Sequence, residues 1–203
     1  MVGPRAWLSR WLLAPRLVAL QVAVARELPA GGRVLDVGCG RGEVAGALAA
    51  RGLEVVGVDV DPDKLAEAER AHGERVGFQR VDGTALPFDD GAFDLAVASL
   101  VLHGISEGER RAMLGELLRV ARRALIMDYA VPLPRRPAGL LFRAIEGASP
   151  SGHHVAFRDF LDRGGLPLLL GGPGLSAERR SPAFDGAMEL WRITPIRPNE
   201  EGS

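Results

Sequence analysis

Val34-Leu35-Asp36-Val37-Gly38-Cys39-Gly40-Arg41-Gly42 is the stretch of the sequence that decides the fold. Its first residues are an apolar run broken only by Asp36, which is typical of a buried strand. Three glycines at alternate positions follow, and residues 43–50 then have the composition of a helix. A strand that ends in glycines and turns directly into a helix lets a ligand approach main-chain N–H groups, because no Cβ stands in the way. The stretch therefore predicts a nucleotide-type binding turn.

A second apolar segment ends in a carboxylate at the distance expected for an acid that binds ribose. Gly52-Leu53-Glu54-Val55-Val56-Gly57-Val58-Asp59 reads as a strand, and Asp59 follows the glycines by about 20 residues. A carboxylate can accept hydrogen bonds from both hydroxyls of a ribose diol. Together the strand, glycine turn, helix, second strand and terminal acid predict a βαβ unit for a ribose-bearing ligand.

The glycine spacing argues against a dinucleotide as that ligand. The dinucleotide fingerprint requires G-x-G-x-x-G, whereas Glu43 stands at the third glycine's position and Gly42 comes one residue early. Glu43 would also place a negative charge beside a pyrophosphate. An NAD(P)-dependent oxidoreductase is therefore the less favoured alternative.

The pattern from Leu35 to Gly42 resembles the first motif of class I S-adenosylmethionine (AdoMet) methyltransferases, whose cofactor carries no phosphate. The resemblance extends over roughly residues 30–195. It implies an α/β fold with a doubly wound, mostly parallel seven-stranded sheet, helices on both faces and an antiparallel C-terminal hairpin. It also implies AdoMet as cofactor and methyl transfer by a single in-line displacement.

The same resemblance implies how residues at the strand ends contact the cofactor. After a third strand over residues 75–81, Asp82 would accept from the adenine amino group, with Val60 and Leu86 packing on the ring. Ser99, at the end of a fourth strand, would offer its main-chain carbonyl to the cofactor's amino group. The expected cofactor-binding residues are Asp36, Gly38, Cys39, Gly40, Asp59, Val60, Asp82, Gly83 and Ser99.

His103 is the first ionisable side chain beyond the fourth strand. In many relatives of the resembled family a histidine here faces the methyl acceptor, which makes His103 the expected catalytic residue. The residues alone leave other bases open, namely Asp128, Tyr129 and the pair His153-His154, and His103 could instead merely cap the strand. No further His or Cys cluster accompanies the histidine pair, so no metal site is expected.

Local signals predict several boundaries along the chain. Asp61 before Pro62 is typical of a helix N-cap with proline in the first turn, and Ser106 with Glu109 matches a capping box. Two final strands, residues 175–180 and 187–193, are expected to be joined by a turn around Pro182 and Asp185.

Length and pattern favour a single domain over residues 1–203. Trp7 and Trp11 lie in an apolar lead that Pro15 should break or kink, and this lead is expected to pack on the sheet or over the cofactor cleft. The expected parts are an N-terminal lead (1–29), an AdoMet-binding core (30–130), a variable cover over the acceptor pocket (131–172) and closing strands (173–197).

The composition limits the classes of partner and indicates the cellular compartment in which the protein is expected. A net charge of −1 implies no general attraction to nucleic acid. The one cysteine, Cys39, excludes a disulfide framework and favours a reducing, cytoplasmic compartment. No stretch is long and apolar enough to predict stable membrane insertion. These features favour a small or lipid-like methyl acceptor. A non-catalytic AdoMet-binding protein is the main alternative, ahead of the oxidoreductase.

Overall fold

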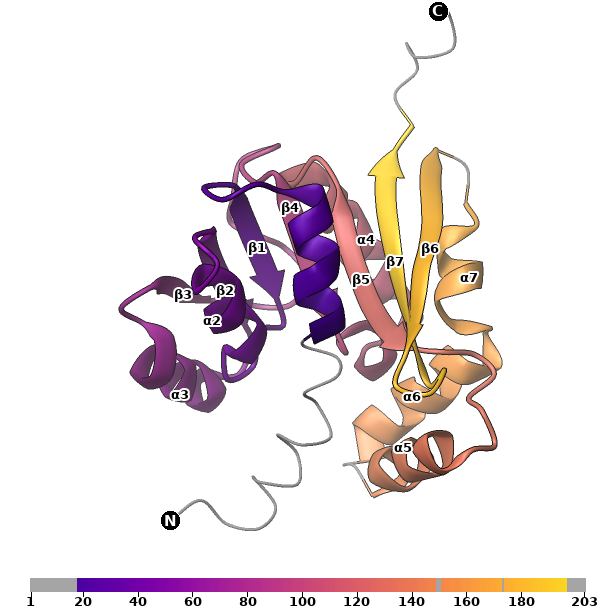
Figure 1. The fold of residues 1–203 in the computed structure, drawn as a ribbon. Helices are drawn as coiled ribbons and strands as arrows, with labels where there is room; N and C mark the ends of the chain where they lie inside the picture. The colour runs from indigo at the N-terminus through magenta and orange to yellow at the C-terminus, as the bar shows by residue number, and fades with distance from the viewer. Residues whose placement is uncertain (1–17, 149–150, 173, 197–203) are drawn as a thin grey trace, which may run out of the picture.

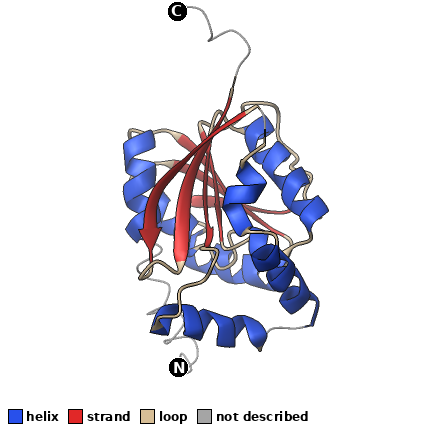
Figure 2. Ribbon diagram, turned by 90° about the vertical axis from the view of Figure 1, so that its right-hand side faces the viewer, coloured by secondary structure: helices blue, strands red, loops and turns tan. Residues whose placement is uncertain are grey.

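A computed structural model of the protein describes residues 18–148, 151–172 and 174–196. They build a seven-stranded sheet in the order β3-β2-β1-β4-β5-β7-β6 (Figure 1). The first five strands pair in parallel, whereas β7 runs antiparallel to both β5 and β6. Helices lie on both faces of the sheet (Figure 2). The predicted fold class is confirmed.

The strands and helices follow the predicted order closely. The strands are β1 (Arg33–Val37), β2 (Glu54–Asp59), β3 (Val76–Arg80), β4 (Leu95–Ser99), β5 (Ala124–Tyr129), β6 (Leu175–Ala183) and β7 (Met188–Pro195). The helices are α2 (Glu43–Ala49), α3 (Pro62–His72), the 3-10 turn η1 (Leu102–Gly104), α4 (Glu107–Val120), α5 (Pro137–Gly147), α6 (Ser151–Asp162) and α7 (Gly165–Leu170). Residues 18–27 form a further helix before β1.

The central strands β4 and β5 are buried at every position. Such continuous burial is expected of parallel strands that are covered on both faces. In Figure 1 the helix at residues 18–27 lies in front of the sheet and α4 lies behind it. Because Asp128 belongs to β5, its carboxylate is held inside the protein and requires partners there.

Several predicted boundaries can be compared directly with the structure. The Asp61 side chain accepts from the N–H groups of Asp63 and Lys64 at the start of α3, as predicted for an N-cap. Pro182, predicted in the final turn, instead lies within β6 opposite Glu189. Since β6 is an edge strand, its proline need not donate to the ladder. The predicted lead around Trp7, Trp11 and Pro15 lies outside the described residues.

The capping box of α4 gives a direct test of the local energetics. The Ser106 Oγ accepts from the Glu109 N–H, while the Glu109 carboxylate accepts from the Ser106 N–H at 2.8 Å. Ser106→Ala should therefore lower the free energy of unfolding by about 0.5–2 kcal/mol, measured by urea denaturation. Ser106→Thr, which keeps the hydroxyl, should lose less. Equal losses in the two variants would contradict the cap's contribution.

Three helices, α5 to α7, form the segment after β5 that the sequence marked as a cover. In Figure 1 α5 and α6 lie beyond the end toward which the β1 and β5 arrows point. Within the described ranges, no helix combines the length and apolar character needed to cross a bilayer.

Candidate active site

A cavity of about 940 Å³ lies at the carboxyl ends of β1, β2 and β4. This is where open parallel sheets bind their ligands, because the glycine turn and strand ends leave main-chain groups accessible there. The predicted cofactor residues that line it are Gly38, Cys39, Gly40, Asp59, Val60, Gly83 and Ser99. Asp36, which is 1% exposed within β1, and Asp82 do not line it.

Glycine is required at the three positions of the turn for different structural reasons. All adopt positive φ angles, with values of 69°, 54° and 76° at Gly38, Gly40 and Gly42. A Cβ on Gly38 would overlap the Val101 side chain, and one on Gly42 would lie 2.8 Å from the Phe78 ring. A Cβ on Gly40 would meet nothing within 4 Å. Gly40 is thus the position where a side chain would enter the cavity.

Asp59 joins the end of β2 to the glycine turn. Its Oδ2 accepts from the Gly40 N–H at 2.7 Å and its Oδ1 from the Asp61 N–H at 3.0 Å. A carboxylate offers about four lone-pair sites, so these two bonds leave capacity for a ribose diol. The acid that the sequence singled out is therefore also a structural part of the turn.

The expected adenine end contains both apolar and polar groups. Val60 is 54% exposed and lines the cavity together with Gly83 and Thr84. The Asp82 side chain is 91% exposed and its Oδ1 lies 3.3 Å from Arg80 Nη2, away from the cavity lining. The adenine contact assigned to Asp82 stays a prediction.

Cys39 lies in the turn as a buried thiol. Burial raises the pKa of the Cys39 thiol, and the nearby carboxylates of Asp36 and Asp59 raise it further. The side chain is therefore a protonated thiol near neutral pH, which is a poor nucleophile. This agrees with a small turn residue rather than a reactive one.

The chain leaves β4 through a residue in an unusual conformation. Leu100 has a φ of 59°, a left-handed value that costs a non-glycine residue about 1–3 kcal/mol. It lines the cavity beside Ser99, whose buried Oγ has no hydrogen-bond partner among the described residues. Strain of this kind gathers at functional sites, and the sequence carried no sign of it.

His103 does not line the cavity, and its side chain is only 4% exposed. Its Nδ1 donates to Asp128 Oδ1 at 2.7 Å, and its main-chain N–H donates to Asp128 Oδ2 at 3.1 Å. The histidine that lines the cavity is His153. A catalytic role for His103 stays a prediction, and in this conformation it would act through neighbouring side chains.

The buried environment of His103 has opposing effects on its protonation. Burial alone lowers the pKa of His103, but the charge and hydrogen bond of Asp128, with Glu146 beyond it, outweigh that effect and raise the pKa above its ordinary value. The neighbouring carboxylates thus favour positive charge at this buried position.

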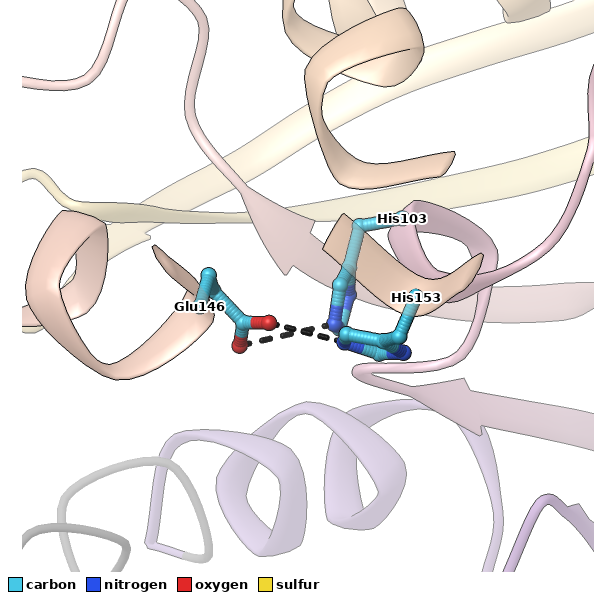
Figure 3. Close-up of side chains that lie close together, drawn as sticks. All are labelled: His103, Glu146 and His153. Carbon is cyan, nitrogen blue, oxygen red and sulfur yellow. Dashed lines mark hydrogen bonds and ion pairs between the residues drawn. The ribbon is translucent and has the colours of Figure 1, made fainter. Parts of the chain in front are cut away.

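Glu146 joins His103 to His153, and we call these three residues the His–Glu cluster (Figure 3). The Glu146 Oε2 accepts from His153 Nε2 at 2.7 Å, and its Oε1 lies 3.7 Å from His103 Nε2. Tyr129 Oη also donates to Glu146 Oε1, at 2.7 Å. The residues come from η1, α5 and α6, which places them at the inner end of the cover.

The sequence interpretation missed Glu146. It lies on α5 four residues after Phe142, and both side chains are buried. The only acid of α5, spaced four residues from Phe142 on the buried face, is the signal that could have revealed it, because buried carboxylates require partners.

Arg110 of α4 forms hydrogen bonds that connect α4 to η1 and to the cover helix α6. Its buried guanidinium donates to the main-chain oxygens of Leu102 and Ala156 at 2.9 and 2.7 Å, and to Asp159 Oδ2 at 2.7 Å. These bonds tie η1 and α6 to α4. Arg110 therefore contributes directly to the position of α6, which carries His153.

Arg110→Met should lower the free energy of unfolding by roughly 2–4 kcal/mol, because it leaves buried acceptors without their donor. Urea denaturation measures the loss. The adjacent Arg111→Met is a matched control, since Arg111 is exposed and pairs with Glu107 one turn away, so its change should stay within about 0.5 kcal/mol. Equal stability of the two variants would contradict the bridging role of Arg110.

Comparison with known families gives a match over the glycine turn and the strands around it. Residues 34–124 match the family model described as "Methyltransferase domain". The matched segment begins in β1 and ends at the first residue of β5. It therefore contains the glycine turn, Asp59 and His103.

Two relatives are similar to this part of the chain. The demethylmenaquinone methyltransferase of Clavibacter sepedonicus is 40% identical over 135 residues, which cover 62% of this chain and 54% of the relative. The demethylmenaquinone methyltransferase of Thermus thermophilus is 39% identical over 119 residues, covering 55% and 53%. The chain spans about half the length of the curated relatives it matches.

Among solved structures, the magnesium protoporphyrin IX methyltransferase of Synechocystis PCC 6803, with S-adenosylhomocysteine bound, is similar over nearly the whole chain. The TM-score is 0.68 at 21% sequence identity, and the match covers 97% of this chain and 89% of the other. At this identity the similarity shows the shared fold.

Proposed function

We infer that this chain belongs to the AdoMet-dependent methyltransferases, because residues 34–124 match a methyltransferase domain and the chain shares its fold with a solved methyltransferase. From this premise we propose that the protein transfers the methyl group of AdoMet to a small, lipid-like acceptor. The observation that carries the proposal is the cavity at the ends of β1, β2 and β4. The space next to Gly40 is open there, and the Asp59 carboxylate accepts a hydrogen bond from the Gly40 N–H.

The proposed cofactor site follows the lining of this cavity. The Asp59 carboxylate would accept from the ribose hydroxyls, and the turn at Gly38 and Gly40 would lie against the methionine part of AdoMet. Val60, Asp82 and Gly83 are assigned to adenine, and the main-chain carbonyl of Ser99 to the amino group. Asp36 and Cys39 complete the set as supports of the turn.

The inner part of the cavity suits an apolar acceptor. Leu100, Val101, Ile105 and Met113 line it. A volume of about 940 Å³ is at the upper end of the roughly 300–1,000 Å³ range typical of ligand pockets, which supports a site for two molecules side by side. Because two relatives are demethylmenaquinone methyltransferases, a naphthoquinol is the first acceptor to test.

Catalysis in this proposal is mainly positional. The sulfonium of AdoMet is already a good electrophile, so the protein contributes by holding nucleophile, methyl carbon and sulfur in line. If the acceptor must lose a proton, the His–Glu cluster at the inner end of the cavity is where that occurs. His103 then serves as a positioning residue, since His153 is the cluster member that lines the cavity.

The test begins with the cofactor. Calorimetric titration of the purified protein should show AdoMet and S-adenosylhomocysteine binding and no NADH binding. NADH binding without AdoMet binding would support the oxidoreductase alternative and refute the proposal. Incubation with methyl-labelled AdoMet and a panel of quinols, phenols and fatty acids should then transfer the label to one acceptor class.

A cytoplasmic location is also part of this proposal.

A further inference from the structure

We propose that the His–Glu cluster of His103, Glu146 and His153 binds one divalent transition-metal cation of the Zn²⁺ type. The site would stand at the inner wall of the cavity, apart from the glycine turn. The proposal that the cluster binds a cation is independent of the proposed function. The proposal that this cation acts on a methyl acceptor rests on the proposed methyltransferase function.

The first argument is the convergence of three ligand atoms of the right kind. One nitrogen from each imidazole and one Glu146 oxygen all lie within 4.8 Å of one another. Zn²⁺ binds imidazole nitrogen and carboxylate oxygen at about 2.0–2.2 Å, which sets tetrahedral ligands about 3.3–3.6 Å apart. The separation of 3.7 Å between His103 Nε2 and Glu146 Oε1 already suits such an ion. The 2.7 Å contact between His153 Nε2 and Glu146 Oε2 would have to widen, and any separation near the 4.8 Å limit would have to shorten.

The second argument is that outer partners already orient these ligands. The bond from His103 Nδ1 to Asp128 Oδ1 leaves Nε2 as the nitrogen that faces Glu146 (Figure 3). A carboxylate behind a ligating histidine is the usual outer partner in zinc sites. Tyr129 Oη fixes Glu146 Oε1 in the same way. Such support is what distinguishes a built site from a chance approach of side chains.

Gly104 allows the third ligand, His153, to approach the other two. A Cβ on Gly104 would lie 2.7 Å from the Cε1 and 2.8 Å from the Nδ1 of His153. The glycine thus lets the imidazole of α6 pack directly against η1, where His103 is located. Its Nε2 is then directed at Glu146.

The third argument is charge. The side chains of Asp128 and Glu146 are 0% and 8% exposed, and their ion-pair partners among the described residues are His103 and His153. Two buried carboxylates without compensation are costly. Arg110 is near, but its guanidinium is engaged by Leu102, Ala156 and Asp159. Either protons on both imidazoles or one dication would balance the two charges.

The position of the cluster gives the cation a use. The His153 side chain is 36% exposed and lines the cavity, whereas His103 and Glu146 lie behind it. With three protein ligands, one coordination position would stay open toward the cavity, as in catalytic zinc sites. A cation there would favour an acceptor that presents a hydroxyl oxygen, because a bound dication lowers the pKa of such a group.

The test uses Co²⁺ as a spectroscopic probe on the 203-residue chain after dialysis against a chelator. We expect visible absorption bands that saturate at one Co²⁺ per chain and disappear when Zn²⁺ is added. Glu146→Gln and His153→Gln should abolish the bands or weaken Co²⁺ binding by at least roughly tenfold. Asp128→Asn should weaken it by roughly 10–100-fold.

His72→Gln is the matched control, because it removes one of the four histidines without touching the cluster. It should leave the bands unchanged, and circular dichroism of each variant verifies the fold. Absence of the bands in the unsubstituted protein, or their persistence in folded His153→Gln, overturns the proposal and leaves a proton-balanced network. AdoMet titration of the same chelated samples reports separately on the proposed function.

Discussion

Gly40→Val is expected to abolish AdoMet binding while the sheet remains intact. A Cβ at this position meets nothing within 4 Å because it enters the cavity, so the two methyl groups of valine would occupy space assigned to the cofactor. The φ of 54° adds backbone strain, since a β-branched residue avoids the left-handed region. Calorimetric titration with AdoMet measures the loss.

The strain and the steric block can be separated by a matched substitution. Gly91 has a φ of 67° and equally open space around its Cβ, but it does not line the cavity. Gly91→Val should therefore lose comparable stability and keep its AdoMet affinity. If Gly40→Val binds AdoMet as tightly as Gly91→Val does, the cofactor does not occupy the glycine turn.

Asp59→Ala should weaken AdoMet binding by roughly 10²–10⁴-fold. Two charge-assisted hydrogen bonds to the ribose are lost, each contributing about 1.5–3 kcal/mol. The substitution also removes the acceptor of the Gly40 and Asp61 N–H groups, so the turn that receives the cofactor loosens. Affinity is measured by calorimetry and the fold by circular dichroism.

Two further variants make the Asp59 prediction specific. Asp59→Asn keeps one acceptor oxygen and should lose less affinity than Asp59→Ala. Asp63→Ala removes an exposed carboxylate four residues away in α3 and should bind AdoMet like the unsubstituted protein. Unchanged affinity in a folded Asp59→Ala variant would remove the ribose assignment.

The sequence by itself determined the fold and the place of the proposed cofactor site. Apolar runs at β1 and β2 predicted the two strands of a βαβ unit, and the family resemblance implied the rest of the parallel sheet. The glycines at 38, 40 and 42 and the acid at Asp59 lie close together along the chain. Their function depends on a strand–turn–helix geometry that local sequence specifies. The same holds for the caps at Asp61 and Ser106, which satisfy main-chain groups within three residues.

Only the tertiary structure decided which side chains surround the proposed acceptor end. His103, Glu146 and His153 come from three elements, and no local pattern reports a contact between residues 103 and 146. His153 joins these two residues because Arg110 ties α6 to η1 and because Gly104 leaves room for the His153 imidazole. The sequence favoured His103 at the acceptor since it follows β4, but the burial of its imidazole depends on α5 and α6 packing over it. Long-range packing therefore determined that His153 lines the cavity and that His103 lies behind it.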